Sequence, residues 1–218
     1  MTSPMKTLIL TLALAAGVVA ATPRASAQAS SLSPGSPAPD FTLKDTGGKD
    51  VTLSSFKGKI VAIDWANYEC PFDRMHYASG NLPGLQKKYT GKGVVWLSIH
   101  SSAPGKEGYF TAEEMKEENA RYGTASTAVL LDPTGAVARL YGAKTTPHLF
   151  VVGTDGTIQY NGAIDSVPST DPKSLPDATP YAATALDALL TGGKPNPAAT
   201  QPYGCSIKFA GTPGFDKK

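Results

Sequence analysis

The two cysteines, Cys70 and Cys205, are the residues of this chain best suited to chemistry. Cys70 stands where a strand-like run, residues 60–65, meets a predicted helix that begins with Pro71. Proline at the first helical position is pre-organised for the helix and gives up no hydrogen bond. Cys70 is therefore expected at or beside the N-cap, where free backbone N–H groups and the helix dipole stabilise a thiolate. One cysteine at such a turn and one near the C-terminus predict redox chemistry.

The N-terminus carries the three parts of a secretory signal. Lys6 is followed by a 14-residue apolar run, residues 8–21, and then by the small-residue site Ala25-Ser26-Ala27. We therefore expect a signal peptide over residues 1–27, with cleavage after Ala27 and a periplasmic or secreted mature protein. The apolar run is shorter than the roughly 20 residues that a membrane span needs, so no span should remain after cleavage. An uncleaved N-terminal anchor is the alternative.

Composition limits the partners of the mature chain. The 191 residues that follow Ala27 fit one domain with a proper core. Lys6 and Arg24 are the only charges removed, so 18 basic residues balance 18 acidic ones. This balance argues against nucleic acid and against an anionic membrane surface as partners. Two cysteines in an exported chain can persist as a disulfide, because that environment is oxidising.

The order of elements predicts an α/β sandwich. A β-hairpin is expected over residues 41–53, with further strands at 60–65, 94–99, 128–131, 149–152 and 157–160. Helices are expected over 71–89, 111–122, 136–141 and 181–190, the first kinked or split by Gly80 and Pro83. Strands separated by helices imply a mostly parallel centre, with antiparallel strands at one side. Residues 28–39 read as an extended lead-in, 40–190 as the domain, and 191–218 as a Gly- and Pro-rich tail carrying Cys205.

The chain resembles the redoxin branch of the thioredoxin superfamily over about residues 34–190. This branch spans alkyl hydroperoxide reductase/thiol-specific antioxidant proteins, peroxiredoxin-like proteins and exported thiol:disulfide oxidoreductases. The resemblance is carried by Pro39-Asp40-Phe41-Thr42-Leu43, the segment from Leu53 to Lys59, Asp64 with Cys70-Pro71-Phe72, and Tyr141 to Pro147. The tail from Pro202 to Lys208 is similar to that of a peroxiredoxin-like subgroup. The resemblance implies a thioredoxin-like sandwich, with a central mixed sheet flanked by helices, an N-terminal hairpin and an extended C-terminal tail.

The resemblance also implies roles for individual residues. Cys70 matches the nucleophilic cysteine of the family. Pro147 matches its cis-proline, which lies opposite that cysteine, with Thr146 offering backbone groups to a bound peptide or thiol. Asp64 has the spacing of the buried acid of thioredoxins, whose raised pKa would let it move protons.

Two departures from the family pattern surround Cys70. The second cysteine of Cys-x-x-Cys is replaced by Asp73, so no thiol in that motif can resolve a mixed disulfide. A carboxylate at that place is expected to raise the pKa of the thiol, against the helix dipole. Asn67 stands where peroxidase members carry threonine, and it could donate a hydrogen bond to a peroxide or thiolate.

Cys205 has two interpretations besides remaining unpaired. It could resolve an oxidised Cys70 through a mobile tail. It could instead form a permanent clasp with Cys70, worth about 5 kcal/mol in the chain-entropy model.

The predicted activity is that of a thiol:disulfide oxidoreductase or peroxiredoxin-like peroxidase that requires no metal or organic cofactor. Its partners would be a thiol- or disulfide-bearing protein or a small peroxide, together with a thiol reductant system. The competing hypothesis is a non-catalytic binding protein of the same fold, either a redox-inert adaptor or a copper carrier using Cys70, Met75 and His76.

Overall fold

A seven-stranded mixed sheet organises the chain in the computed structural model, which describes Met1 and residues 32–217. The strands of this sheet are β1 (Thr42–Asp45), β2 (Asp50–Thr52), β3 (Val61–Trp65), β4 (Val95–His100), β5 (Ala128–Leu131), β7 (His148–Val152) and β8 (Ile158–Gly162). A separate two-stranded sheet joins β6 (Thr145–Thr146) to β9 (Cys205–Ser206). The helices are α1 (Pro71–Ala78), α2 (Asn81–Thr90), α3 (Ala112–Tyr122), α4 (Ala136–Tyr141) and α5 (Tyr181–Leu190), with 3-10 turns over Leu53–Phe56 and Pro172–Asp177.

The sheet has the order β2-β1-β5-β4-β3-β7-β8. Its centre, β5-β4-β3, is parallel, whereas the hairpins β1–β2 and β7–β8 add antiparallel strands at the two sides. The sequence predicted this parallel centre correctly. Strand β3 is buried along its whole length, as expected for a central strand covered on both faces.

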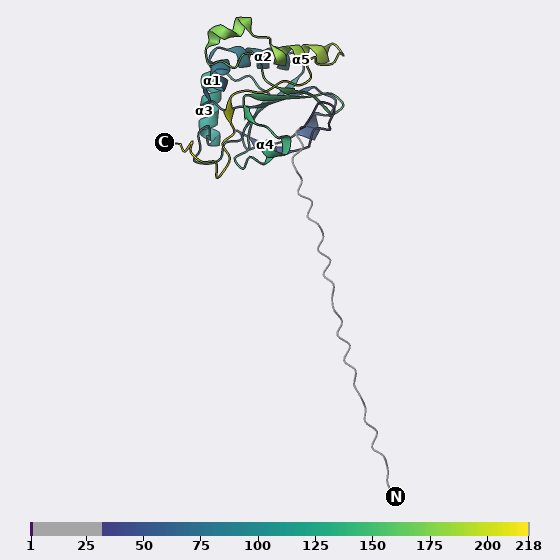
Figure 1. Cartoon of the computed structure of the whole chain (residues 1–218), viewed down its shortest axis with the longest axis vertical. Helices are drawn as coiled ribbons and strands as arrows, with labels where there is room; N and C mark the ends of the chain where they lie inside the picture. Colours follow the sequence, from purple (N-terminus) through teal and green to yellow (C-terminus); the bar gives the residue numbers. More distant parts are fainter. Residues whose placement is uncertain (2–31, 218) are drawn as a thin grey trace.

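Two apolar cores lie on opposite faces of the sheet, because side chains alternate along each strand. On one face, Val61, Ile63 and Trp65 pack against α4 and the N-terminal hairpin. On the other, Ala62 packs with side chains of α1, α2, α3 and α5. Figure 1 shows the same division, with α4 on one side of the sheet and α2 and α5 on the other. Asp64 alternates with Ile63 and Trp65 and therefore faces the α1 side of the sheet.

The predicted helix over residues 71–89 is two helices. Gly80 ends the first with a φ of 79°, a left-handed conformation that glycine adopts without steric cost. Asn81 then begins α2, in which Pro83 occupies the first turn, where its missing N–H costs no helical hydrogen bond. The other predicted helices are confirmed, including the reciprocal capping box between Thr111 and Glu114 at the start of α3.

Both ends of the described chain lie on the domain. Residues 32–39 run beside β8, with backbone hydrogen bonds from Gly35 N to Ile158 O (2.8 Å) and from Ile158 N to Ser36 O (2.8 Å). The tail returns across β8 and then pairs with β6, and its residues Ile207 and Lys208 are buried. The predicted signal peptide, with its cleavage site after Ala27, lies outside the described residues. Within residues 32–217, no helix combines the length and apolar character needed to cross a membrane.

Candidate functional site

Cys70 is the N-cap residue of α1, as the sequence predicted. Its backbone is extended (φ −70°, ψ 122°), and Pro71 follows at the first helical position. The last strand residue before this turn is Trp65, so β3 and α1 together fix where the sulfur lies. The side chain of Cys70 is fully buried, whereas Cys205 is only partly buried. Both cysteines are free thiols in this structure.

The surroundings of Cys70 favour its thiolate. Hydrogen bonding by the Cys205 side chain is the main cause that lowers the pKa of Cys70 to about 6, assisted by the backbone N–H groups of Asp73 and Cys205. Burial opposes the shift without cancelling it. The Cys205 N–H lies 3.4 Å from Cys70 Sγ, and the thiol form of Cys70 donates to the Thr146 carbonyl at 3.0 Å. Hydrogen bonding to Cys70 first, and then burial, raise the pKa of Cys205.

Cys205 reaches this position as part of a β-strand. Its partner in the antiparallel β6–β9 pair is Thr146, and Ser206 pairs with Thr145. Gly204, with a φ of 123°, permits the close approach, because a Cβ atom there would overlap the carbonyl oxygen of Thr146. The tail is thus built to lie against the strand that precedes Pro147.

The peptide bond between Thr146 and Pro147 is cis, as the resemblance implied. The backbone edge that was expected to receive a peptide partner is occupied by β9 of the same chain. A second cis bond, Asn196–Pro197, lies in the tail and was not foreseen. The structure therefore assembles Cys70, Cys205, Thr146 and Pro147 at one place.

The expected effect of Asp73 on Cys70 is wrong. A carboxylate was predicted to raise the pKa of the thiol, yet that pKa is lowered. The reason is that Asp73 is itself fully buried. Burial first, and then the charge of Asp64, raise the pKa of Asp73 well above its ordinary value, which disfavours the ionised carboxylate beside the sulfur. Its backbone N–H, meanwhile, contributes to lowering the pKa of Cys70.

Asp64 is also fully buried. Burial raises its pKa to about 7. Its carboxyl oxygens lack hydrogen bonds of ordinary geometry, although the Trp96 and Tyr77 side chains lie near enough to limit the rise. The pKa of Asp73 responds to both Asp64 and Cys70. Asp64, Asp73 and Cys70 are therefore close enough for their charges to influence one another, a relationship that the sequence did not suggest.

Asn67 has a different position from the one expected. Its side-chain oxygen accepts a hydrogen bond from Glu69 N at 2.9 Å, and its backbone N–H donates to Asp73 Oδ2. The side chain is buried beneath Gly108, where a Cβ atom would overlap the Asn67 amide. Asn67 thus shapes the turn before Cys70, and its amide makes no hydrogen bond with the sulfur among the described contacts.

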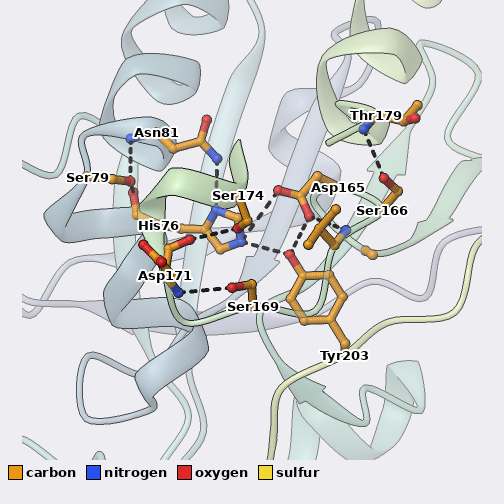
Figure 2. A network of polar contacts seen from close by, with 12 residues as sticks. His76, Ser79, Asn81, Asp165, Ser166, Ser169, Asp171, Ser174, Thr179 and Tyr203 are labelled. Carbon is orange, nitrogen blue, oxygen red and sulfur yellow. Dashed lines mark hydrogen bonds and ion pairs between the residues drawn. The ribbon is translucent and has the colours of Figure 1, made fainter. Parts of the chain in front are cut away.

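Sequence reasoning missed two residues that hold the C-terminal tail on the domain, Tyr203 and Asp165. Tyr203 donates from its hydroxyl to Asp165 Oδ1 at 2.6 Å and lies 2.9 Å from His76 Nε2 (Figure 2). His76 was considered a possible copper ligand, but both of its ring nitrogens make hydrogen bonds. Within residues 32–217, no three His, Cys, Asp or Glu side chains are grouped to hold a metal. The spacing Tyr203-Gly204-Cys205 was the only signal available for Tyr203.

The sequence profile of the AhpC/TSA family matches residues 34–161, which is more than half of the chain. The chain therefore belongs to the AhpC/TSA family. This finding confirms the predicted redoxin resemblance.

Named relatives support the same class. Thiol-disulfide oxidoreductase ResA of Geobacillus thermodenitrificans is 28% identical over 157 residues, covering 71% of this chain and 83% of the relative. A probable phospholipid hydroperoxide glutathione peroxidase 6 of Arabidopsis thaliana is 36% identical over 76 residues, covering 35% of this chain and only 32% of the relative. These relatives support the prediction of an oxidoreductase.

Solved structures agree on the fold. A hypothetical protein from Sinorhizobium meliloti 1021 matches with a TM-score of 0.73 and 28% identity, covering 84% of this chain and 98% of that one. A putative thiol:disulfide interchange protein DsbE from Chlorobium tepidum matches with a TM-score of 0.50 and 27% identity, covering 60% and 85% of the two chains. The predicted thioredoxin-like sandwich with a mixed central sheet is confirmed.

Proposed function

We propose that this protein is an exported thiol-dependent oxidoreductase in which Cys70 is the nucleophile and Cys205 the resolving cysteine. The observation that carries the proposal is the contact between the two cysteines, which are 135 residues apart in sequence. The Cys205 backbone N–H points to Cys70 Sγ, and the pKa of Cys70 is lowered to about 6. At neutral pH, Cys70 is therefore mostly a thiolate, the form that attacks peroxides and disulfides.

Cys70 and Cys205 would share the reaction in two steps. With a hydroperoxide, the Cys70 thiolate attacks the terminal oxygen, the O–O bond breaks, and the alcohol leaves with one proton. Cys70 is then a sulfenic acid, and attack by the Cys205 sulfur forms the disulfide and releases water. With a disulfide substrate, Cys70 first forms a mixed disulfide, and Cys205 displaces the remaining thiol. An external thiol system must then reduce the Cys70–Cys205 disulfide, consuming two thiols.

Asp73 and Asp64 would supply protons during the first step. Both lie on the buried side of Cys70, and both have raised pKa values caused mainly by burial. A neutral acid can protonate the departing alkoxide or thiolate, whereas an ionised one cannot. The pKa of Asp64, about 7, suits proton transfer in both directions near neutral pH.

The occupied β6 edge favours a small first substrate. With β9 in place, an extended peptide cannot pair with Thr146, since Cys205 already does so. Cys70 has no exposed surface, whereas Cys205 is partly exposed. A substrate would therefore reach the Cys70 sulfur from the side of Cys205. A small peroxide or disulfide therefore needs less displacement of the tail than a protein partner would.

The test is the midpoint potential of the Cys70–Cys205 couple, with mass spectrometry identifying the bonded residues. A potential well above about −300 mV is expected for an exchangeable disulfide. A Cys205→Ser variant treated with peroxide should accumulate sulfenic acid at Cys70. A lower potential would mean a structural clasp, and full activity of a Cys70→Ser variant would favour the binding-protein hypothesis.

A further inference from the structure

A chain of polar groups, buried at His76 and Asp165 and partly buried at Asn81 and Tyr203, holds the tail two residues before Cys205. Asn81 Nδ2 lies 2.8 Å from His76 Nδ1, His76 Nε2 lies 2.9 Å from the Tyr203 hydroxyl, and that hydroxyl lies 2.6 Å from Asp165 Oδ1. Figure 2 shows these side chains converging from α1, the start of α2, the loop after β8 and the tail. Three segments distant in sequence, α1, the loop after β8 and the tail, therefore meet at the Tyr203 hydroxyl, and Asn81 holds the other side of the His76 ring.

With His76 neutral and the Asn81 amide oriented as in the structure, one arrangement of hydrogens satisfies these groups. The Asp165 carboxylate can only accept, so the Tyr203 hydroxyl donates to it. The hydroxyl oxygen must then accept from His76 Nε2–H, which leaves Nδ1 to accept from the Asn81 amide. The tautomer is assigned from this network. His76 is fully buried and Asp165 is nearly so, and hydrogen bonds to charged groups in such places are among the stronger ones.

The tail is fixed on both sides of Cys205. Upstream, the Tyr203 ring also packs edge-on against Phe72 in the first turn of α1, with ring centroids 6.0 Å apart. Downstream, Ile207 is buried in the core on the α4 side, and Lys208 is buried beside it. The segment between these anchors carries Cys205 past Cys70.

We propose that Tyr203, held by His76 and Asp165, is a positioning residue that keeps Cys205 in register with Cys70. It touches neither sulfur in the described contacts and acts through the backbone of Gly204 and Cys205. Without the hydroxyl anchor, the tail would still be tied at Ile207, but Cys205 would sample other positions. The effective concentration of its sulfur at Cys70 would fall, as would its hydrogen bonding to that thiolate. The inference rests on the proposed resolving role of Cys205.

The test compares Tyr203→Phe with Tyr89→Phe in the full mature protein. Both variants lose one tyrosine hydroxyl that bonds to another segment, because Tyr89 donates to Ala183 O at 3.0 Å between α2 and α5. Tyr203→Phe should raise the pKa of Cys70 toward that of a free thiol, measured by the pH dependence of alkylation. It should also weaken the Cys70–Cys205 disulfide about tenfold, raising the midpoint potential by about 30 mV. Tyr89→Phe should change neither quantity.

Asp165→Asn provides a second variant, because its amide oxygen still accepts from Tyr203 while the negative charge is lost. Asp165→Asn should raise the pKa of Cys70 and the midpoint potential of the Cys70–Cys205 couple, each by less than Tyr203→Phe does. Unchanged pKa and potential in Tyr203→Phe would overturn the positioning role. A wild-type couple below about −300 mV, or one that does not form, would refute the proposed function instead. In that case, the pKa of Cys70 in reduced Tyr203→Phe, compared with reduced wild type, would still show whether Tyr203 positions Cys205.

Discussion

Thr146 and Cys205 are antiparallel β partners, and this pairing brings the tail of the chain against the residue that precedes the cis-proline. The same pairing directs the Cys205 N–H to Cys70 Sγ at 3.4 Å. The surroundings of Cys70 are thus completed by a segment from the far end of the chain. Four predictions follow from this arrangement and from the buried groups around it.

Removing the Cys205 side chain should raise the pKa of Cys70. In the Cys205→Ala variant, that pKa should move from about 6 toward the unperturbed value near 8.5, because the main stabilising hydrogen bond is lost. Cys205→Ser keeps a hydroxyl donor and should show a smaller rise. Thiolate absorbance followed against pH measures both. Equal pKa values in Cys205→Ala and wild type would show that other groups stabilise the thiolate.

Gly204→Ala should displace β9 while leaving both cysteines present. The new Cβ would overlap the Thr146 carbonyl oxygen, which belongs to backbone and cannot rotate away. We expect Cys70–Cys205 disulfide formation to slow by roughly tenfold or more, as expected when a reacting pair loses its orientation. Gly211→Ala is the matched control, because Gly211 also has a positive φ (81°) but its Cβ would meet nothing within 4 Å. Similar rates in the two variants would refute the steric argument.

Asp73→Asn should stabilise the protein progressively as the pH rises above about 4. The folded-state pKa of Asp73 is raised by burial, so the folded protein holds a proton that the unfolded chain releases near pH 3.9. Wild type therefore loses about 1 kcal/mol per pH unit from this group between that value and the folded-state pKa. The asparagine variant has no proton to lose. Denaturant unfolding of wild type and Asp73→Asn at several pH values measures the difference, and an equal pH dependence of the two would contradict this assignment.

His100→Leu should protect the protein against acid. Burial lowers the pKa of His100 to about 3, and neither ring nitrogen has a hydrogen-bond partner in the structure. In the unfolded chain His100 is protonated below about pH 6.5, whereas in the folded protein it stays neutral down to about pH 3. His100 therefore lowers the free energy of unfolding as the pH falls from about 6.5 to 3. Leucine cannot be protonated, so the His100→Leu variant should avoid this loss, which amounts to about 1 kcal/mol for each pH unit in that range.

His148→Leu is the contrasting variant for this prediction. His148 is also buried, with its pKa lowered to about 4, but both of its nitrogens are bonded, to Asn161 Oδ1 and Lys144 N. Leucine there would leave two polar groups without partners, so the variant should be less stable at neutral pH. An equal response of the two variants would contradict the role assigned to hydrogen bonding.

Local sequence patterns were sufficient for most of the fold. The helices over 136–141 and 181–190 have the predicted bounds, because caps, periodicity and turn residues act over a few positions. Cys70 at the N-cap followed from Pro71 for the same reason. The cis bond at Pro147 came from family resemblance, since no local pattern specifies it.

The missed features depend on contacts between distant segments. The β6–β9 pair has strands of two residues each, too short to leave an alternating pattern. The contact between His76 and Tyr203 joins residues 127 positions apart. The effect of Asp73 was misjudged because its charge state depends on burial, which the sequence around it does not reveal. The predicted strands over 60–65 and 94–99, which carry the buried Trp65 and Trp96, needed only the apolar pattern of one segment each.

The burial of Ile207 in the core has a consequence for when the thiol becomes reactive. Ile207 lies near the end of the chain, and its site is formed by α4, β3 and the N-terminal hairpin, which must assemble around it. Until it docks, Cys205 has no fixed place beside Cys70, and Cys70 behaves as an ordinary cysteine. The low pKa of Cys70 is therefore a property of the folded protein, in which Ile207 is buried and Cys205 lies beside Cys70.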